Sequence, residues 1–250
     1  MNSEIILSRS FLESHPFDAA RVLENLNPAE VAELLQKFPP KSVAAPVLQL
    51  MDIVSASECL SKWSDENSEG VLSFLPLHYT ARLLRRMEEE NRNRLLKQVS
   101  EEKLKSIRTL LRFPDNTAGA LMDPRILALP EDISIGEAQK RIQRKLRDTF
   151  YYIFIVSRDD RLVGVIDLRE LMFADRKQSL SSAMHRSVER ISARAKQEAI
   201  LSHPGWRRLH TLPVVDDKET FLGVIRYQTM REIEKSSKRK YWNCFRPYVV

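Results

Sequence analysis

A stretch in the second half of the chain alternates short apolar runs with polar turns. Residues 150–156 are aromatic and β-branched, residues 157–161 are polar, and residues 162–166 are apolar again. Aromatic and β-branched runs of this length are typical of buried strands. Residues 168–174 then place apolar side chains at helical spacing. The pattern predicts a strand, a turn, a second strand and a helix within residues 149–184.

The same order of elements returns downstream. Residues 208–216 and 221–225 read as two strands around a polar turn, and residues 228–234 have helical spacing. Gly164 and Gly223 take the same place in the second strand of the two copies. A duplicated β-β-α unit predicts two similar modules, and repeats of this kind usually pack against each other.

The first part of the chain, residues 1–112, shows helical spacing only. Asn27 followed by Pro28 marks a helix start, and comparable starts lie at Pro76 and Ser100. Each start opens a run of about three helical turns with one apolar face. Short helices in series predict a stacked superhelix, an architecture that provides an interaction surface but does not by itself define a function.

Two serines are predicted to begin helices inside the duplicated region. Ser134 precedes a helical pattern at 135–146, and Ser192 precedes one at 193–202. Residues 203–205, His-Pro-Gly, should end the second of these helices, because proline cannot continue it.

Composition limits the class of protein. The chain has 250 residues, of which 43% are hydrophobic and 30% charged, and its net charge is +6. Acidic residues are interleaved with the basic ones, which favours a solvated surface over a nucleic-acid site. Cys59 and Cys244 are too far apart to suggest a disulfide framework or zinc site, so a cytoplasmic location is expected. No apolar run approaches the roughly 20 residues that span a bilayer, and none resembles a signal peptide.

Catalytic motifs are not found in the sequence. It contains no glycine-rich dinucleotide fingerprint, P-loop or nucleophile elbow, and no histidine stands four residues from another. We therefore expect a protein that is not an enzyme.

The order of several motifs resembles that of a known family. FPDNTAGALM at 113–122 precedes YYIFIV at 151–156 and RLVGVIDLREL at 161–171. The two β-β-α copies resemble a pair of CBS domains, and together with the helical part they resemble the cytosolic region of MgtE-type magnesium transporters, without the pore. The resemblance implies an α+β multi-domain fold. Its parts are an all-α superhelix at 1–122, CBS domain 1 at 123–184, CBS domain 2 at 185–237, and a basic and aromatic tail at 238–250.

The resemblance to CBS pairs implies a cleft for an adenine nucleotide. In the family pattern a carboxylate for the ribose follows the strand glycine, and in this chain Glu170 takes that position. Asp167 stands where a Thr or Ser is usual, and Arg226 and Thr229 are the equivalents in the second copy. The alternative is that these residues only begin surface helices, where an acid is favoured by the helix dipole.

The resemblance to the transporters also implies Mg²⁺ as a ligand, held through carboxylates as this ion requires. The acid-rich helix of the second CBS domain corresponds here to residues 193–198, in which Arg194 and Lys196 are basic and Glu198 is the only acid. The facing segment of the helical domain corresponds to residues 77–82, Leu-His-Tyr-Thr-Ala-Arg. We expect magnesium-dependent closure to be lost or strongly weakened.

The resemblance finally implies the partners. CBS pairs usually form homodimers, and the transporter itself is a candidate partner. The tail at 238–250 has the composition of a membrane-interface contact, or of a segment that packs on the body.

The expected function is a non-catalytic cytosolic regulator or sensor linked to magnesium transport or homeostasis. The alternatives are an adenine-nucleotide-binding CBS module and an interaction scaffold without ligand sensing. The following basic residues could meet an acidic protein or a phosphate, or could be solubilising charge: Arg141, Arg144, Lys145, Arg147, Arg194, Lys196, Arg207 and Arg208.

Overall fold

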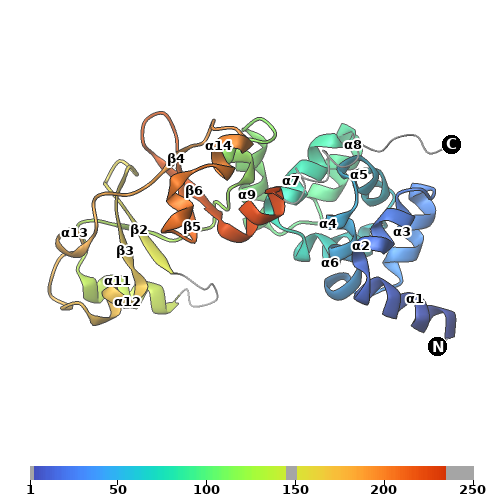
Figure 1. The fold of residues 1–250 in the computed structure, drawn as a ribbon, viewed down its shortest axis with the longest axis horizontal. Helices are drawn as coiled ribbons and strands as arrows, with labels where there is room; N and C mark the ends of the chain where they lie inside the picture. The colour runs from blue at the N-terminus through green and yellow to red at the C-terminus, as the bar shows by residue number, and fades with distance from the viewer. Residues whose placement is uncertain (1–2, 145–150, 235–250) are drawn as a thin grey trace. The chain divides into compact units, whose positions relative to one another are not determined.

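The structure is a computed structural model that describes residues 3–144 and 151–234. The chain divides into two compact units, Met1–Arg112 and Phe113–Val250. Figure 1 shows the helices of the first unit in blue to green and the mixed helices and strands of the second in green to red.

Unit 1 consists of short helices, as the sequence pattern predicts. Helices packed together mostly stand two apart in the chain: α2 on α4, α3 on α5, α5 on α7, α6 on α8 and α7 on α9. This order produces the predicted superhelix. Its elements are α1 (Ser3–Ser14), α2 (Pro16–Leu23), α3 (Pro28–Gln36), the π-helical turn η1 (Pro40–Ala44), α4 (Ala45–Leu50), α5 (Ile53–Ser61), α6 (Asp65–Phe74), α7 (Leu77–Arg86), α8 (Glu89–Leu96) and α9 (Glu101–Leu111).

The helix starts of unit 1 follow from local chemistry. The side chain of Asn27 accepts a hydrogen bond of 2.9 Å from the backbone N–H of Ala29, which confirms Asn27 as the N-cap of α3. Pro76 and Ser100 stand at the N-cap positions of α7 and α9. The helices bury mainly aliphatic side chains, and their packing supplies most of the stability of such short elements.

Unit 2 holds two three-stranded sheets of the same topology. In each sheet the first strand runs parallel to the second, and the second pairs antiparallel with the third. The first half comprises α10 (Ala118–Leu121), β1 (Ala128–Pro130), α11 (Ile135–Arg144), β2 (Tyr152–Val156), β3 (Leu162–Asp167), α12 (Leu168–Phe173) and α13 (Leu180–Ala183). The second comprises β4 (Ile191–Ser192), α14 (Gln197–Leu201), η2 (Pro204–Arg207), β5 (Thr211–Val215), β6 (Phe221–Arg226) and a helical stretch at 227–234.

The two halves of unit 2 share a hydrophobic core. The rings of Phe154 and Phe221 stack with their centroids 5.2 Å apart. The hairpin turns also exchange backbone hydrogen bonds, from Leu162 N–H to the Glu219 carbonyl at 3.0 Å and from Phe221 N–H to the Asp160 carbonyl at 2.9 Å. The predicted repeat is therefore one compact pair and not two independent modules.

The segment before β1 belongs to unit 2. The N–H groups of Ala118 and Gly119 donate to the carbonyls of Ala195 and Ala193 at 2.8 and 2.9 Å. Asp123 exchanges two backbone hydrogen bonds with Val224 of β6, at 2.7 and 3.0 Å. The compact division thus falls at Arg112 and Phe113, ahead of the boundary at 122 that the sequence suggests.

The helix predicted to start after Ser192 is wrong in its first part, because α14 begins only at Gln197. Ser192 is the last residue of β4, and its side chain accepts a hydrogen bond from Arg194 N–H at 3.2 Å. Ala193 N–H donates to the Val215 carbonyl at 2.7 Å, and the carbonyls of Ala193 and Ala195 are held by α10. These backbone groups are used in tertiary pairing, so the local helical pattern cannot form from 193. By contrast, the cap at Ser134 is confirmed by a 3.2 Å bond from Glu137 N–H.

Candidate ligand-binding site

Two of the predicted nucleotide residues lie at the junction of β3 and α12. Asp167 accepts a hydrogen bond of 2.7 Å from Arg169 N–H, and Glu170 accepts one of 3.3 Å from Asp167 N–H. The two acids form a capping box, which satisfies backbone donors at the start of the helix. This arrangement accounts for both acids through helix capping alone.

Glu170 has a second partner. Its Oε2 lies 2.9 Å from His185 Nε2, and both side chains are more than half exposed. His185 is held in place because its backbone exchanges hydrogen bonds of 2.8 and 3.0 Å with Val165 of β3. A ligand hydroxyl that bound Glu170 would have to share it with the cap and with His185.

Arg226, the residue of the second half that is equivalent to Asp167, forms an ion pair with the segment before β1. Its Nη2 lies 3.2 Å from Asp123 Oδ2, and Asp123 also accepts hydrogen bonds from Arg125. Burial of Asp123 disfavours its ionised form, but the bonds from Arg125 and the charges of Arg125 and Arg226 outweigh burial and lower its pKa. Thr229 lies half-buried in the helical stretch 227–234.

Both hairpins turn the same end toward one region. Asp167 pairs with Tyr152 in the register of β2 and β3, and Arg226 pairs with Thr211 in that of β5 and β6. Tyr151 directly precedes Tyr152, and His210 directly precedes Thr211. The rings of Tyr151 and His210 are in contact, with their centroids 5.8 Å apart. The strand ends that carry the predicted residues therefore lie around a shared point between the halves.

This point is occupied by rings that we call the aromatic array: Tyr151, His210, Tyr227 and Trp206. The ring of His210 lies 6.3 Å from that of Tyr227, which lies 6.0 Å from Trp206. Tyr151 is 59% exposed and Tyr227 40% exposed. Trp206 is fixed by a 2.6 Å hydrogen bond from its Nε1 to the Ile200 carbonyl. Exposed, positioned rings offer faces on which a planar ligand can stack.

The aromatic array was not predicted from the sequence, although the repeat contains a signal for it. Tyr151 and His210 directly precede the equivalent strands β2 and β5. Their carbonyls accept equivalent hydrogen bonds from Leu168 N–H at 3.0 Å and from Tyr227 N–H at 2.9 Å. Aligning the two copies would have shown an aromatic or imidazole ring directly before the second strand of each sheet.

The residues considered for magnesium belong to α14 of unit 2 and to α7 of unit 1. Glu198 lies exposed on α14, and Arg194 pairs with Asp217 at 3.2 Å. In α7 most of the segment 77–82 is core, including Tyr79, whose hydroxyl donates to the Leu48 carbonyl. Burial raises the pKa of Tyr79 well above its ordinary value. Among the described residues no three His, Cys, Asp or Glu side chains come together as a metal site.

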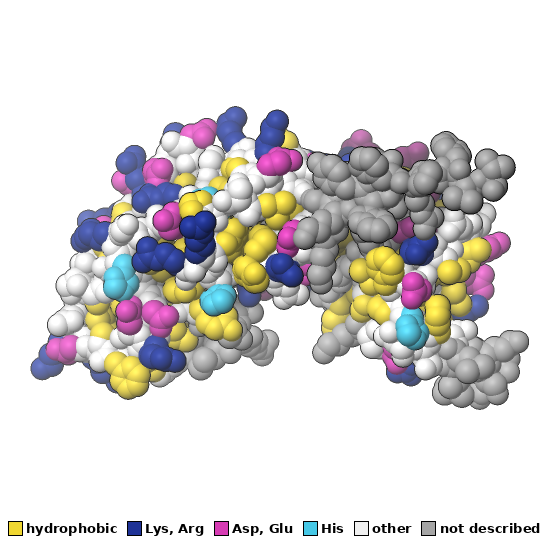
Figure 2. Space-filling model, in the orientation of Figure 1, with side chains coloured by type: hydrophobic (Ala, Val, Ile, Leu, Met, Phe, Trp, Pro, Cys, Tyr) yellow, Lys and Arg dark blue, Asp and Glu magenta, His cyan; other side chains and the backbone are white. Residues whose placement is uncertain are grey.

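The basic residues of unit 2 are partly paired. Arg141 bonds Glu137 at 2.9 Å along α11. Figure 2 shows Lys and Arg side chains interspersed with Asp and Glu over the visible face, as the sequence indicates. Lys145, Arg147 and the tail at 238–250 lie outside the described residues. Within the described ranges no helix has the length and hydrophobicity to cross a bilayer.

Sequence comparisons identify both parts of the chain. Residues 14–116 match the MgtE intracellular N domain, and residues 118–177 match the CBS domain. The magnesium transporter MgtE of Thermus thermophilus is 30% identical over 121 residues, which cover 48% of this chain and 27% of that protein. MgtE of Bacillus subtilis is 21% identical over 222 residues, 83% of this chain and 49% of that protein. The chain spans half or less of the length of these relatives.

Solved structures show the same fold. The soluble part of a magnesium transporter superposes with a TM-score of 0.63 at 18% identity, covering 94% of this chain and 98% of that one. The cytosolic domain of the Mg²⁺ channel MgtE in complex with ATP gives 0.55 at 24% identity, covering 86% and 93%. The predicted architecture, a helical superhelix followed by a CBS pair, is confirmed. The chain is thus a homologue of the MgtE magnesium transporters that combines their intracellular N domain with a CBS domain pair.

Proposed function

We propose that this chain is a non-catalytic, cytoplasmic regulator of magnesium transport that acts on an MgtE-type transmembrane pore. The observation that carries the proposal is the succession of an N domain and a CBS pair, the architecture of the cytosolic domain of the Mg²⁺ channel MgtE. Neither part needs a catalytic residue for this role, because a regulator only has to bind its ligand differently in two states.

The CBS pair is the part suited to sense a ligand. The aromatic array lies where the two halves meet, so a ligand stacked on Tyr151 or Tyr227 would contact both hairpins at once. Such a ligand favours whichever arrangement of the halves provides both contacts. A pore that binds this chain would then respond to the arrangement that the ligand favours.

An adenine nucleotide is our first candidate for that ligand. The related cytosolic domain was solved with ATP, and the aromatic array offers ring faces for an adenine. Arg226 and Thr229 follow the second hairpin, whereas Asp167 and Glu170 are engaged in the capping box. We therefore place the phosphates toward Arg226, which would exchange Asp123 for the ligand.

Magnesium sensing of the family's kind is proposed to be weak in this chain. The segment 193–198 carries Arg194 and Lys196 beside Glu198, and these cations repel a divalent ion. Residues 77–82 offer mostly buried, apolar positions in place of carboxylates. If neither magnesium nor nucleotide binds, the remaining proposal is a scaffold that works through its superhelix.

We also propose a homodimer formed through the CBS pair. On α12 the side chain of Phe173 is 86% exposed and that of Met172 is 47% exposed, although both are apolar. Apolar side chains clustered on one surface helix favour a protein contact. Light scattering of the full chain should give twice the monomer mass, and Phe173→Glu should lower it. An unchanged mass would contradict this contact.

The regulatory role is tested by binding. A detergent-solubilised MgtE pore without its own cytosolic part is immobilised, and the full chain is passed over it. Saturable binding that changes with added ATP or Mg²⁺ is expected. No saturable binding under any of these conditions would contradict a regulatory role at such a pore.

A further inference from the structure

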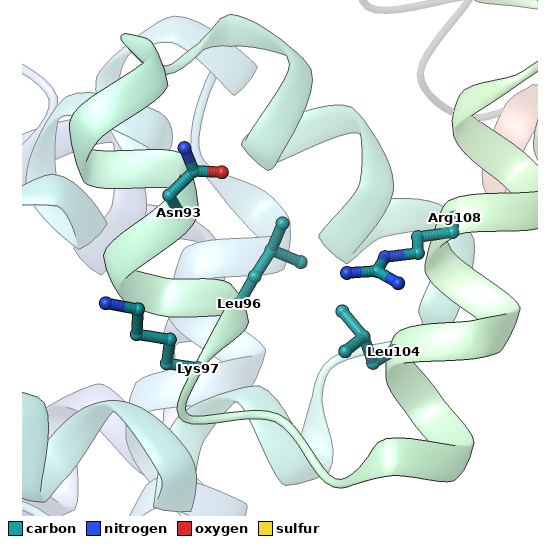
Figure 3. A pocket seen from close by; sticks show the side chains of 5 residues that line it. All are labelled: Asn93, Leu96, Lys97, Leu104 and Arg108. Atoms are coloured by element: carbon teal, nitrogen blue, oxygen red, sulfur yellow. The ribbon is translucent and has the colours of Figure 1, made fainter.

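A hollow of about 380 Å³ lies between α8 and α9 in unit 1. Its lining residues are Asn93, Leu96 and Lys97 from α8 and the loop after it, and Leu104 and Arg108 from α9. In Figure 3 the side chains of Leu96 and Leu104 point toward one another from the two helices, and the guanidinium of Arg108 reaches over the same space. The Lys97 amine is directed to the outer side of α8. We call this hollow the α8–α9 groove.

The cations of the α8–α9 groove are free, whereas Arg94 of α8 and Lys103 of α9 are used in the fold. Within the described part of the chain, Lys97 and Arg108 make no side-chain hydrogen bond or ion pair. Arg94 instead bonds Asp65 at 2.6 Å and the Ser61 carbonyl at 2.7 Å, and Lys103 bonds backbone carbonyls of α6. Structural packing explains Arg94 and Lys103 and leaves Arg108 available.

The groove also exposes apolar surface for a topological reason. In a superhelix each helix is normally covered by a later one, but α9 is the last helix of unit 1 and packs on α7. Leu96 and Leu104 remain only half-buried, with no later helix of unit 1 to cover them. An apolar floor beside a free guanidinium suits a ligand that has both a hydrophobic and an anionic part.

We propose that the α8–α9 groove docks an acidic amphipathic segment of a partner protein. A leucine-like side chain of the segment would fill the space between Leu96 and Leu104. A carboxylate beside it would accept hydrogen bonds from the Arg108 guanidinium, whose planar donors match a carboxylate. Lys97 lies at the rim, where a charge mainly speeds association.

Charge complementarity favours an acidic partner over residues 235–250 of the same chain. The C-terminal sequence carries Lys238, Arg239 and Lys240 in succession, and residues 235–250 contain no acid. A basic segment would be repelled by Arg108 and Lys97. Polyanions such as nucleic acids would gain nothing from the two leucines at the floor.

The test uses the full chain with labelled leucine methyl groups and two synthetic amphipathic peptides. Both peptides carry leucines on one face, and the other face carries glutamates in one and lysines in the other. The glutamate peptide should shift the methyl resonances of Leu96 and Leu104 saturably, and the lysine peptide should not. Arg108→Gln should weaken the affinity about threefold to tenfold.

The matched control is Arg21→Gln, which removes the same charge from an exposed position on α2, a helix that packs on α1 and α4. It should leave the affinity unchanged. Equal losses in the two variants would mean unspecific attraction and would overturn the proposal. Silent Leu96 and Leu104 methyls would overturn it too, because the groove would then be closed to an acidic segment. Neither result would affect the regulatory role proposed for the CBS pair.

Discussion

The two glycines that occupy equivalent places in the repeat should respond differently to substitution. A Cβ added at Gly223 would lie 2.6 Å from the Asp123 carbonyl oxygen and 3.0 Å from Pro124 Cα. Both are backbone atoms, so the strand β6 and the segment before β1 would have to separate. A Cβ at Gly164 would instead meet the sulfur end of the Met184 side chain. Methionine has three rotatable bonds and can yield.

The magnitude follows from what must move. Separation at Gly223 endangers the two backbone hydrogen bonds between Asp123 and Val224, of 2.7 and 3.0 Å. Loss of one of them costs about 1 kcal/mol, and overpacking itself costs about 1–3 kcal/mol. We expect Gly223→Ala to lower the free energy of unfolding of unit 2 by about 2–4 kcal/mol, and Gly164→Ala by about 1 kcal/mol.

Hydrogen–deuterium exchange with mass spectrometry can measure this loss for each unit separately. A single unfolding curve would mix the two units, because two-state behaviour is not expected of a chain with two compact parts. Peptides from residues 113–234 should lose protection in Gly223→Ala, while those from unit 1 keep it. If the amides of unit 2 are as well protected in Gly223→Ala as in Gly164→Ala, the segment before β1 does not pack on β6 as described.

Three further predictions concern charge and ligands. Asp123→Asn should destabilise unit 2 by about 1–2 kcal/mol at neutral pH. Because the pKa of Asp123 is lowered in the folded protein, its contribution to the free energy of unfolding is present above the unfolded pKa of about 4 and is lost as the pH falls through the folded pKa. A pH-independent difference in stability between wild type and Asp123→Asn, measured by chemical denaturation, would contradict this prediction. Tyr227→Ala should weaken ATP binding about tenfold in calorimetry, while Glu170→Gln should change the affinity little. A larger loss of affinity in Glu170→Gln than in Tyr227→Ala would indicate that ATP binds at α12 and not at the aromatic array. Millimolar Mg²⁺ should leave the rate of limited proteolysis almost unchanged, and strong protection would show that Glu198 and its neighbours still sense the ion.

Much of the fold could be predicted from the sequence because it rests on local signals. Asn27 and Ser134 cap helices as their side chains suggest, and the strands β2, β3, β5 and β6 lie within or close to their apolar runs. The duplicated order of elements also predicts the two antiparallel hairpins, β2 with β3 and β5 with β6. These features depend on side-chain size and hydrogen-bonding groups that neighbours in the chain supply.

What the sequence could not show depends on tertiary contacts. The helical pattern after Ser192 fails because Ala193 and Ala195 pair with α10 and β5, partners that are distant along the chain. The acids Asp167 and Glu170 begin a helix, which is the alternative that the sequence offers to a ribose site, but the contact of Glu170 with His185 joins residues 15 apart and is seen only in the structure. The aromatic array forms because two hairpins bring Tyr151 to His210, a contact that no single segment records.

Magnesium flux tests the central claim, regulation of a transporter by this chain, most directly. An MgtE pore without its cytosolic part is placed in liposomes that contain a fluorescent Mg²⁺ indicator, and the full chain is added with and without ATP. We predict that the chain changes the initial rate of Mg²⁺ entry saturably and that ATP alters this effect. A rate that is the same with and without the chain, at every nucleotide concentration, would contradict the account.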